Sequence, residues 1–326
     1  ACYHNLFIFT LAKITKETML ANFLNKSNPI NFIGLVTFFA ICFLTINFID
    51  FFNNPLNAND LLQKIVVLLV FMFIFFIYNF ITSKNNLTYD NSFGFYFFTL
   101  LTGCFSSIAT YKTLFFTIIY LLFLRKIYSL QSSKRVLKKL FDAGFWLGIL
   151  CVFEPKFMLL FLLIYLSAYW HQKITIHTFS VPIIGILTPL FCYFSYLFWQ
   201  GNQANLLENL FQKFTFKIYF LSEEKETIFM ISLLFTTFFA VFFKSRKALL
   251  INNTFKKSWS LLLMNFLIVL GLFLFENESK NKEILFLFFP ISLILANGIE
   301  LLQKKIVVNI FLYLFLIGCI GFLFSL

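Results

Sequence analysis

An acid and a base lie side by side at the joint between two apolar segments of the chain. The stretch GILCVFEPKFMLLF, residues 148–161, places Glu154, Pro155 and Lys156 between runs that are otherwise almost wholly apolar. Ionisable side chains inside a membrane are costly and usually functional, whereas at the headgroups they form an ordinary surface ion pair. Glu154 and Lys156 are therefore candidate site residues, either at the tip of a re-entrant hairpin in a protein-lined cavity or in a plain loop, which is the simpler interpretation.

A third candidate group, Asp50, closes the first apolar segment in TINFIDFFNN. A carboxylate at the outer end of a helix can act as a general base toward a substrate bound at the membrane surface. The simpler alternative is a hydrated aspartate at a helix end. If the chain is an enzyme, Asp50 would act as the base, and Glu154 and Lys156 would form a charge clamp.

Familiar catalytic and metal-binding patterns are missing from the sequence. It holds no Walker loop, no HExxH, no GxSxG and no dinucleotide-binding fingerprint. His171 and His177 have no nearby Cys, Asp or Glu to complete a metal set, so we predict neither a metal nor a cofactor. No apolar segment carries an acid near its centre, which disfavours an ion-coupled transporter.

The composition places these groups in a membrane protein. Of the 326 residues, 60% are hydrophobic and 12% are charged, and a water-soluble domain of this length could not cover its surface with so few polar groups. Repeated apolar runs with short polar joints predict an all-α, polytopic transmembrane bundle. We divide the chain into a cytoplasmic N-terminal segment, residues 1–29, with Met19 as a candidate native start, and a single transmembrane domain, residues 30–326.

About eleven apolar segments are candidate membrane spans. They cover residues 30–50, 65–82, 93–110, 112–125, 139–153, 157–170, 178–199, 228–243, 259–276, 284–300 and 306–325. A full crossing takes about 20 residues. The short segments therefore predict tight helical hairpins, one with Glu154 at its tip and a neighbouring one with Lys112 at its tip.

Local features define the hairpin around Glu154. Asp142 is expected in the first turn of its first helix, where a carboxylate faces unpaired N–H groups. Gly144 and Gly148 form a small-xxx-small face that permits close contact with another helix. Pro155 then interrupts the chain between the two arms.

The distribution of positive charge predicts the orientation of the bundle. With the N-terminus in the cytoplasm, 18 of the 26 Lys and Arg residues fall in cytoplasmic segments, as the positive-inside rule requires, and the C-terminus is outside. The net charge of +12 then reflects topology and contact with anionic lipids, and nucleic acid is not an expected partner. In the longest outer loop, residues 206–218 repeat apolar side chains at helical spacing and predict an amphipathic interfacial helix.

Two stretches and the run of spans together carry a resemblance to a family. They are MLANFLNKSNPINFIG, residues 19–34, and RKIYSLQSSKRVLKKLFDAGFWLGIL, residues 125–150. From Met19 onward the chain resembles an uncharacterised multi-span inner-membrane protein family of Bacteroidetes-type bacteria. The resemblance implies the bacterial inner membrane and no assigned activity. Some relatives are labelled beta-carotene monooxygenases, a reaction that needs several histidines around iron, and this chain has 3 His.

The layout of the chain is similar to that of the GT-C class of lipid-linked sugar transferases. The shared features are many spans, short hairpins and an acid after the first helix. In that class an outer-loop acid acts as a base, which would correspond to Asp50, but the paired acidic motif and the large outer domain are missing. The leading hypothesis is a non-catalytic component of an envelope or membrane complex that contacts membrane lipids and partner subunits. The alternatives are a GT-C-like transferase acting on a polyprenyl-linked substrate at the outer face and, third, a transporter, so whether the chain is an enzyme is left open.

Overall fold

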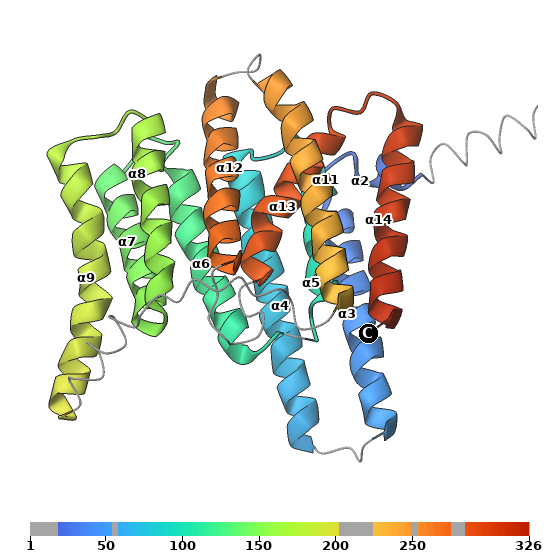
Figure 1. Cartoon of the computed structure of the whole chain (residues 1–326), viewed down its shortest axis with the longest axis horizontal. Helices are drawn as coiled ribbons and strands as arrows, with labels where there is room; N and C mark the ends of the chain where they lie inside the picture. The colour runs from blue at the N-terminus through green and yellow to red at the C-terminus, as the bar shows by residue number, and fades with distance from the viewer. Residues whose placement is uncertain are drawn as a thin grey trace, which may run out of the picture.

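The computed structural model of the protein describes six stretches of the chain: residues 19–53, 58–107, 109–201, 224–248, 253–274 and 284–325. All regular structure within them is helical (Figure 1). This confirms the predicted all-α class for the described part of the chain.

A helix lies at each apolar segment that the sequence singles out. These helices are α3 (Pro29–Asn53), α4 (Ala58–Asn85), α5 (Phe93–Cys104), α6 (Tyr111–Ser129), α7 (Val136–Phe153), α8 (Phe161–Trp170), α9 (Ile176–Trp199), α11 (Glu224–Ala248), α12 (Asn253–Leu274), α13 (Ile284–Ile299) and α14 (Lys305–Ser325). In addition, a short helix α2 (Leu20–Leu24) precedes α3, and a 3-10 helix η1 (Pro155–Leu160) leads into α8.

Fewer helices than expected are able to span a membrane alone. In the described residues, 6 helices are long and apolar enough, namely α3, α4, α9, α11, α12 and α14. Helices α5 and α13 and the η1–α8 arm are apolar but shorter. The expected count of about eleven spans is therefore not confirmed. Helix α5 has 12 residues, all of them buried, so it is about 18 Å long and is surrounded by protein. Hydropathy alone does not distinguish that environment from lipid.

The helices alternate in direction, so that their joints gather at two faces of the bundle (Figure 1). We call the face with the α4–α5, α6–α7, α8–α9 and α13–α14 joints the upper face, and the face with the α5–α6 and α7–η1 joints the lower face. Hydrogen bonds tie the upper joints together. The backbone N–H of Ser92 donates to Leu24 O at 2.8 Å, and Lys173 Nζ donates to Leu130 O at 2.6 Å.

Aromatic side chains fill the centre of the bundle, where the short helices α5 and α13 pack against each other. Tyr78 stacks on Phe98 with ring centroids 4.0 Å apart, and Tyr120 stacks on Phe286 at 4.4 Å. All four side chains are buried. The phenylalanine excess therefore builds the protein core as well as the apolar outer surface.

Helices α7 and α9 pack backbone to backbone, as the spacing of Gly144 and Gly148 predicts. A Cβ atom on Gly144 would lie 2.3 Å from the carbonyl oxygen of Pro182, and one on Gly148 would lie 2.6 Å from that of Ile186. Gly185 completes the contact from the α9 side. No larger residue fits at these separations, so glycine sets the distance between the two helices.

The prediction for Asp142 is wrong. Helix α7 begins at Val136, earlier than the apolar run indicates, so Asp142 lies in its second turn, away from the unpaired N–H groups. The carboxylate instead accepts a hydrogen bond from Lys126 Nζ of α6 at 2.6 Å. The basic segment before Asp142 is thus part of the helix, and the aspartate joins α7 to α6.

Candidate functional site

The joint between α7 and η1 brings three charged side chains together at the lower face. Glu154 Oε2 lies 3.0 Å from Lys156 Nζ, and Glu154 Oε1 lies 2.9 Å from Lys112 Nζ, at the start of α6. The side chains of Glu154 and Lys156 are only 18% and 17% exposed, and that of Lys112 is 47% exposed. The two hairpin tips that the sequence treats separately therefore meet, and the predicted Glu154–Lys156 pair gains a second lysine.

The two lysines keep the Glu154 carboxylate ionised. Burial by itself would raise its pKa, but the hydrogen bond from Lys112 and the charge of Lys156 outweigh burial and hold the pKa of Glu154 below its ordinary value. A carboxylate with a lowered pKa is a weak proton acceptor. Glu154 therefore suits the role of a fixed anion that holds two cations better than that of a general base.

The side chain of Asp50, the predicted base, lies outside the described residues, as does the segment 206–218 that is predicted to form an amphipathic helix. Helix α3, which contains position 50, packs on α4 and α5, whereas Glu154 binds the first turn of α6. In the described residues, the third member of the Glu154 cluster is Lys112, which the sequence analysis did not select.

An apolar groove of about 350 Å³ runs beside the Glu154 joint. It is lined by Cys151, Pro155, Met158 and Phe161 on one side and by Ile183, Ile186, Leu187 and Leu190 of α9 on the other. Pro155, which lines the groove, lies in the chain between the two charged residues of the joint. The apolar lining suits a hydrocarbon chain whose polar end lies near the ion pairs.

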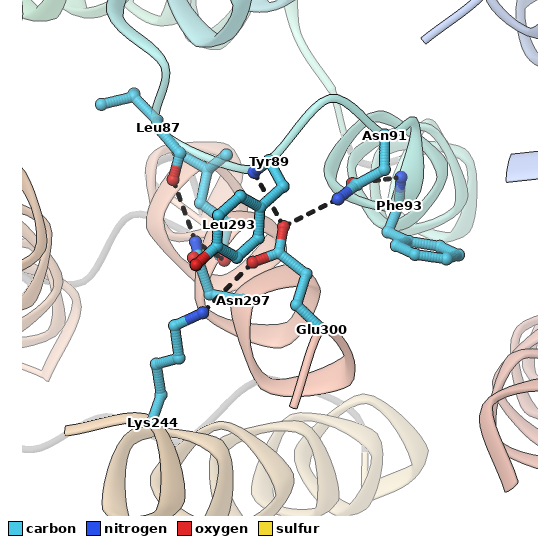
Figure 2. Close-up of polar contacts among 8 residues, drawn as sticks. All are labelled: Leu87, Tyr89, Asn91, Phe93, Lys244, Leu293, Asn297 and Glu300. Carbon is cyan, nitrogen blue, oxygen red and sulfur yellow. Dashed lines mark hydrogen bonds and ion pairs between the residues drawn. The ribbon is translucent and has the colours of Figure 1, made fainter. Parts of the chain in front are cut away.

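A second polar cluster, which the sequence analysis missed, lies at the α4–α5 joint of the upper face, and Figure 2 shows its contacts. Lys244 near the end of α11 and Glu300 directly after α13 form an ion pair with Nζ and Oε2 3.2 Å apart, and their side chains are 0% and 4% exposed. Glu300 Oε1 accepts hydrogen bonds from the backbone N–H of Tyr89 at 2.9 Å and from Asn91 Nδ2 at 2.7 Å. The ammonium group also lies 5.3 Å and 5.2 Å from the ring centres of Tyr89 and Phe255.

Asn297, one turn before Glu300, holds the beginning of the same loop (Figure 2). Its Nδ2 donates to Leu87 O at 3.1 Å as well as to Leu293 O at 2.8 Å. The loop of residues 86–92, which joins α4 to α5, is thereby attached to α13 near both of its ends. We call Lys244, Asn297 and Glu300 the clasp.

The clasp positions the loop. A buried ion pair gains little net stability, because both charges lose water, and it is tolerated when further hydrogen bonds satisfy the charged groups. Here those further bonds go to the loop. A sequence signal was present, since Lys244 and Glu300 carry opposite charges and each ends an apolar run on the side predicted to be cytoplasmic. Their pairing, however, depends on the packing of α11 against α13.

Comparison with known proteins identifies a family to which no activity is assigned. The description "Family of unknown function (DUF6427)" matches residues 19–326. The chain belongs to DUF6427. No curated protein and no solved structure matches it. DUF6427 membership agrees with the resemblance to an uncharacterised multi-span family, and the function of this member has to be argued from its geometry.

The two clusters of this DUF6427 protein offer different chemistry. The lower cluster is an ionised carboxylate between two ammonium groups beside an apolar groove. The upper cluster is a buried ion pair that shapes a loop. Among the residues that the structure describes, no group of His, Cys, Asp and Glu is arranged to hold a metal ion. What the two clusters can do is bind and position polar groups at the ends of membrane helices.

Proposed function

We propose that the protein is a non-catalytic, multi-pass component of the bacterial inner membrane, with one membrane domain over residues 30–326, that contacts lipids and partner subunits in an envelope complex. The observation that carries this proposal is the state of Glu154. Lys112 and Lys156 occupy both of its carboxylate oxygens. A group engaged in this way holds two hairpins together and is poorly suited to accept a proton.

The arrangement of the joints supports an orientation with the N-terminus in the cytoplasm and the C-terminus outside. The upper face gathers the basic joints, including Arg135, Lys139, Lys173, Lys304 and Lys305. Among the described residues, the lower-face joints that contain Lys112 and Lys156 carry fewer basic residues, and Glu154 neutralises part of their charge. Under the positive-inside rule the upper face is cytoplasmic.

The test compares the full-length wild-type chain with Glu154→Gln and with the control Gln200→Ala, which changes an exposed lower-face residue. Each is extracted from its own membranes in a lipid-retaining polymer, and the mass of the assembly is measured. Cellular lipid-linked sugars are quantified in parallel. We expect a mass above that of one chain plus lipid in the wild type and unchanged lipid-linked sugars in every strain. An isolated chain, or a lipid-linked precursor that accumulates in Glu154→Gln but in neither the wild type nor Gln200→Ala, would contradict the proposal.

A second candidate function is transfer to or from a polyprenyl-linked substrate. The observation that favours it is the apolar groove of about 350 Å³ beside the Glu154 joint, which would take the polyprenyl chain and leave its phosphate near Lys112 and Lys156. Asp50 would then have to act as the base. Accumulation of the same precursor in Asp50→Asn and in Glu154→Gln is the result expected of this function.

A further inference from the structure

A polar cavity of about 480 Å³ opens at the upper face beside the loop of residues 86–92. Its walls come from the start of α3, the end of α4, the loop itself and the start of α5. The volume falls in the range of about 300–1,000 Å³ typical of small-molecule sites. The two functions considered above make no use of this cavity.

Several polar side chains in the cavity are not used by the fold. The side-chain amides of Asn28, Asn79 and Asn86 line it and form no hydrogen bond with any other part of the chain that the structure describes. Each amide offers two donor hydrogens and an acceptor oxygen. The hydroxyls of Ser83 and Thr88 line the same space. The cavity therefore presents donors and acceptors together.

The lining excludes strongly charged ligands. It contains no Lys, Arg or His, and its one carboxylate, Asp90, already accepts a hydrogen bond from Ser27 Oγ. A phosphate would meet no cation there, and a cation would meet a single engaged acid. Hydroxyl groups donate and accept at once, which matches the amides. The rings of Phe32 and Tyr89 add apolar surface for the C–H face of a sugar ring.

We propose that this cavity binds a neutral polyhydroxylated group, a sugar, either free or as the headgroup of a glycolipid. The position of the cavity accommodates both sources. Phe76 lines it and is also 61% exposed on the outer side of α4, so a lipid tail can leave the cavity along that helix. This inference does not depend on the proposed non-catalytic role.

The clasp gives the cavity a fixed wall. Tyr89 and Asn91 line the cavity, and both are bound by Glu300, which is held in turn by Lys244 (Figure 2). A wall that is ordered before the ligand arrives lowers the cost of binding. Glu300 is thus a positioning residue that acts through the loop.

The binding test uses the full chain purified in an amine-oxide detergent, which carries no sugar of its own. The probes are glucose, monoglucosyl diacylglycerol and, as a charged comparison, phosphatidylglycerol, and bound probe is counted by native mass spectrometry. The double variant Asn28→Ala/Asn79→Ala removes two unused amides, and it spares Asn86, whose left-handed backbone (φ 48°) favours asparagine over alanine. The control Gln131→Ala removes an amide on the same face outside the cavity. We expect saturable binding of a glucose-bearing probe that weakens tenfold or more in the double variant and is unchanged in the control.

Every outcome decides the matter. Binding of glucose alone identifies a free-sugar site, and preference for the glycolipid identifies a lipid headgroup site. Phosphatidylglycerol binding as tightly as the glycolipid, equal binding by the double variant, or no sugar binding at saturating probe overturns the proposal. Thermal unfolding of each variant verifies that the chain is folded, as expected for amides without partners in the described chain.

The role of the clasp has a separate readout. Glu300→Gln keeps an oxygen for Tyr89 and Asn91, whereas Glu300→Leu does not. If Glu300 positions the wall, the glutamine variant retains sugar affinity within about threefold of the wild type, and the leucine variant loses tenfold or more while still folded. Equal sugar affinity in both variants, despite different thermal stability, would show that the clasp is only structural.

Discussion

Lys244 Nζ and Glu300 Oε2 lie 3.2 Å apart, although 56 positions separate the two residues in the chain. The pair joins the end of α11 to the end of α13, and Glu300 extends the link to the α4–α5 loop through Tyr89 and Asn91. Three elements that lie far apart in the sequence thus meet at two buried charges. These charges are the most deeply buried ion pair among the described residues.

The first prediction concerns this pair. Lys244→Met leaves the Glu300 carboxylate buried without its cation, and we expect it to lower the free energy of unfolding by about 3–5 kcal/mol. Lys244→Met combined with Glu300→Gln removes both charges and keeps an acceptor for the loop, so most of the loss should be recovered. Denaturant titration in micelles measures both values. A double variant no more stable than Lys244→Met would refute the assignment.

The lower-face pair of Lys112 and Glu154, in which the lysine is exposed, provides the comparison. Lys112 is 47% exposed, and exposed ion pairs contribute about 0–1 kcal/mol. Lys112→Met should therefore change the free energy of unfolding by no more than about 1 kcal/mol, measured by the same titration. A loss as large as that of Lys244→Met would mean that burial does not set the difference between the two clusters.

The second prediction concerns the α7–α9 contact. Gly144→Ala places a methyl group 2.3 Å from the carbonyl oxygen of Pro182, so the helices must move apart, at a cost of about 1–3 kcal/mol. Gly271→Ala in α12 is the matched control, because nothing lies within 4 Å of the added Cβ. The control should be neutral or slightly stabilising, since alanine favours helix more than glycine does. Equal thermal unfolding of the two variants would contradict the close contact.

The third prediction concerns pH. Burial and the charges of Lys173 and Lys257 lower the pKa of His171, which follows α8, from 6.5 to about 4. Between these values the unfolded chain binds a proton that the folded chain does not, so stability rises with pH. The contribution of His171 to the free energy of unfolding is complete above about pH 6.5 and is lost as the pH falls toward 4.

Thermal unfolding of His171→Gln at pH 7.5 and pH 5 checks this prediction. The variant should lose less stability on acidification than the wild type does. His177→Gln is the matched control, because it removes an exposed histidine of the same joint region, and it should behave as the wild type. An identical acid response in the wild type and His171→Gln would show that His171 takes up its proton equally well in both states.

The fourth prediction concerns orientation. In a cysteine-free background, Ser133→Cys places a thiol in the α6–α7 joint of the upper face and Ser107→Cys places one in the α5–α6 joint of the lower face. With the upper face in the cytoplasm, a membrane-impermeant maleimide labels Ser107→Cys in spheroplasts and Ser133→Cys only after permeabilisation. The reverse pattern would invert the proposed topology.

Part of the candidate site was predictable from local sequence. Glu154 and Lys156 stand two positions apart at a proline break, so their pairing follows from the chain itself. Lys112 joins them only because α6 packs along α7. The clasp was missed for the same reason. Lys244 and Glu300 each look like an ordinary charge at the end of an apolar run until α11 and α13 are placed against each other.

Composition and local pattern were enough to predict a membrane environment and the positions of the helices. Long apolar runs with few charges favour helices, because a helix satisfies its backbone groups within one segment of the membrane, and the glycine spacing of α7 marks a close helix contact. The packing of the folded chain was needed to show which helices are enclosed by protein, which helix faces those glycines, and which charges meet. An apolar helix has the same hydropathy whether protein or lipid surrounds it, so its sequence alone does not tell the two environments apart. An ion pair or a cavity wall, in turn, exists only when distant segments of the chain come within a few ångströms of each other.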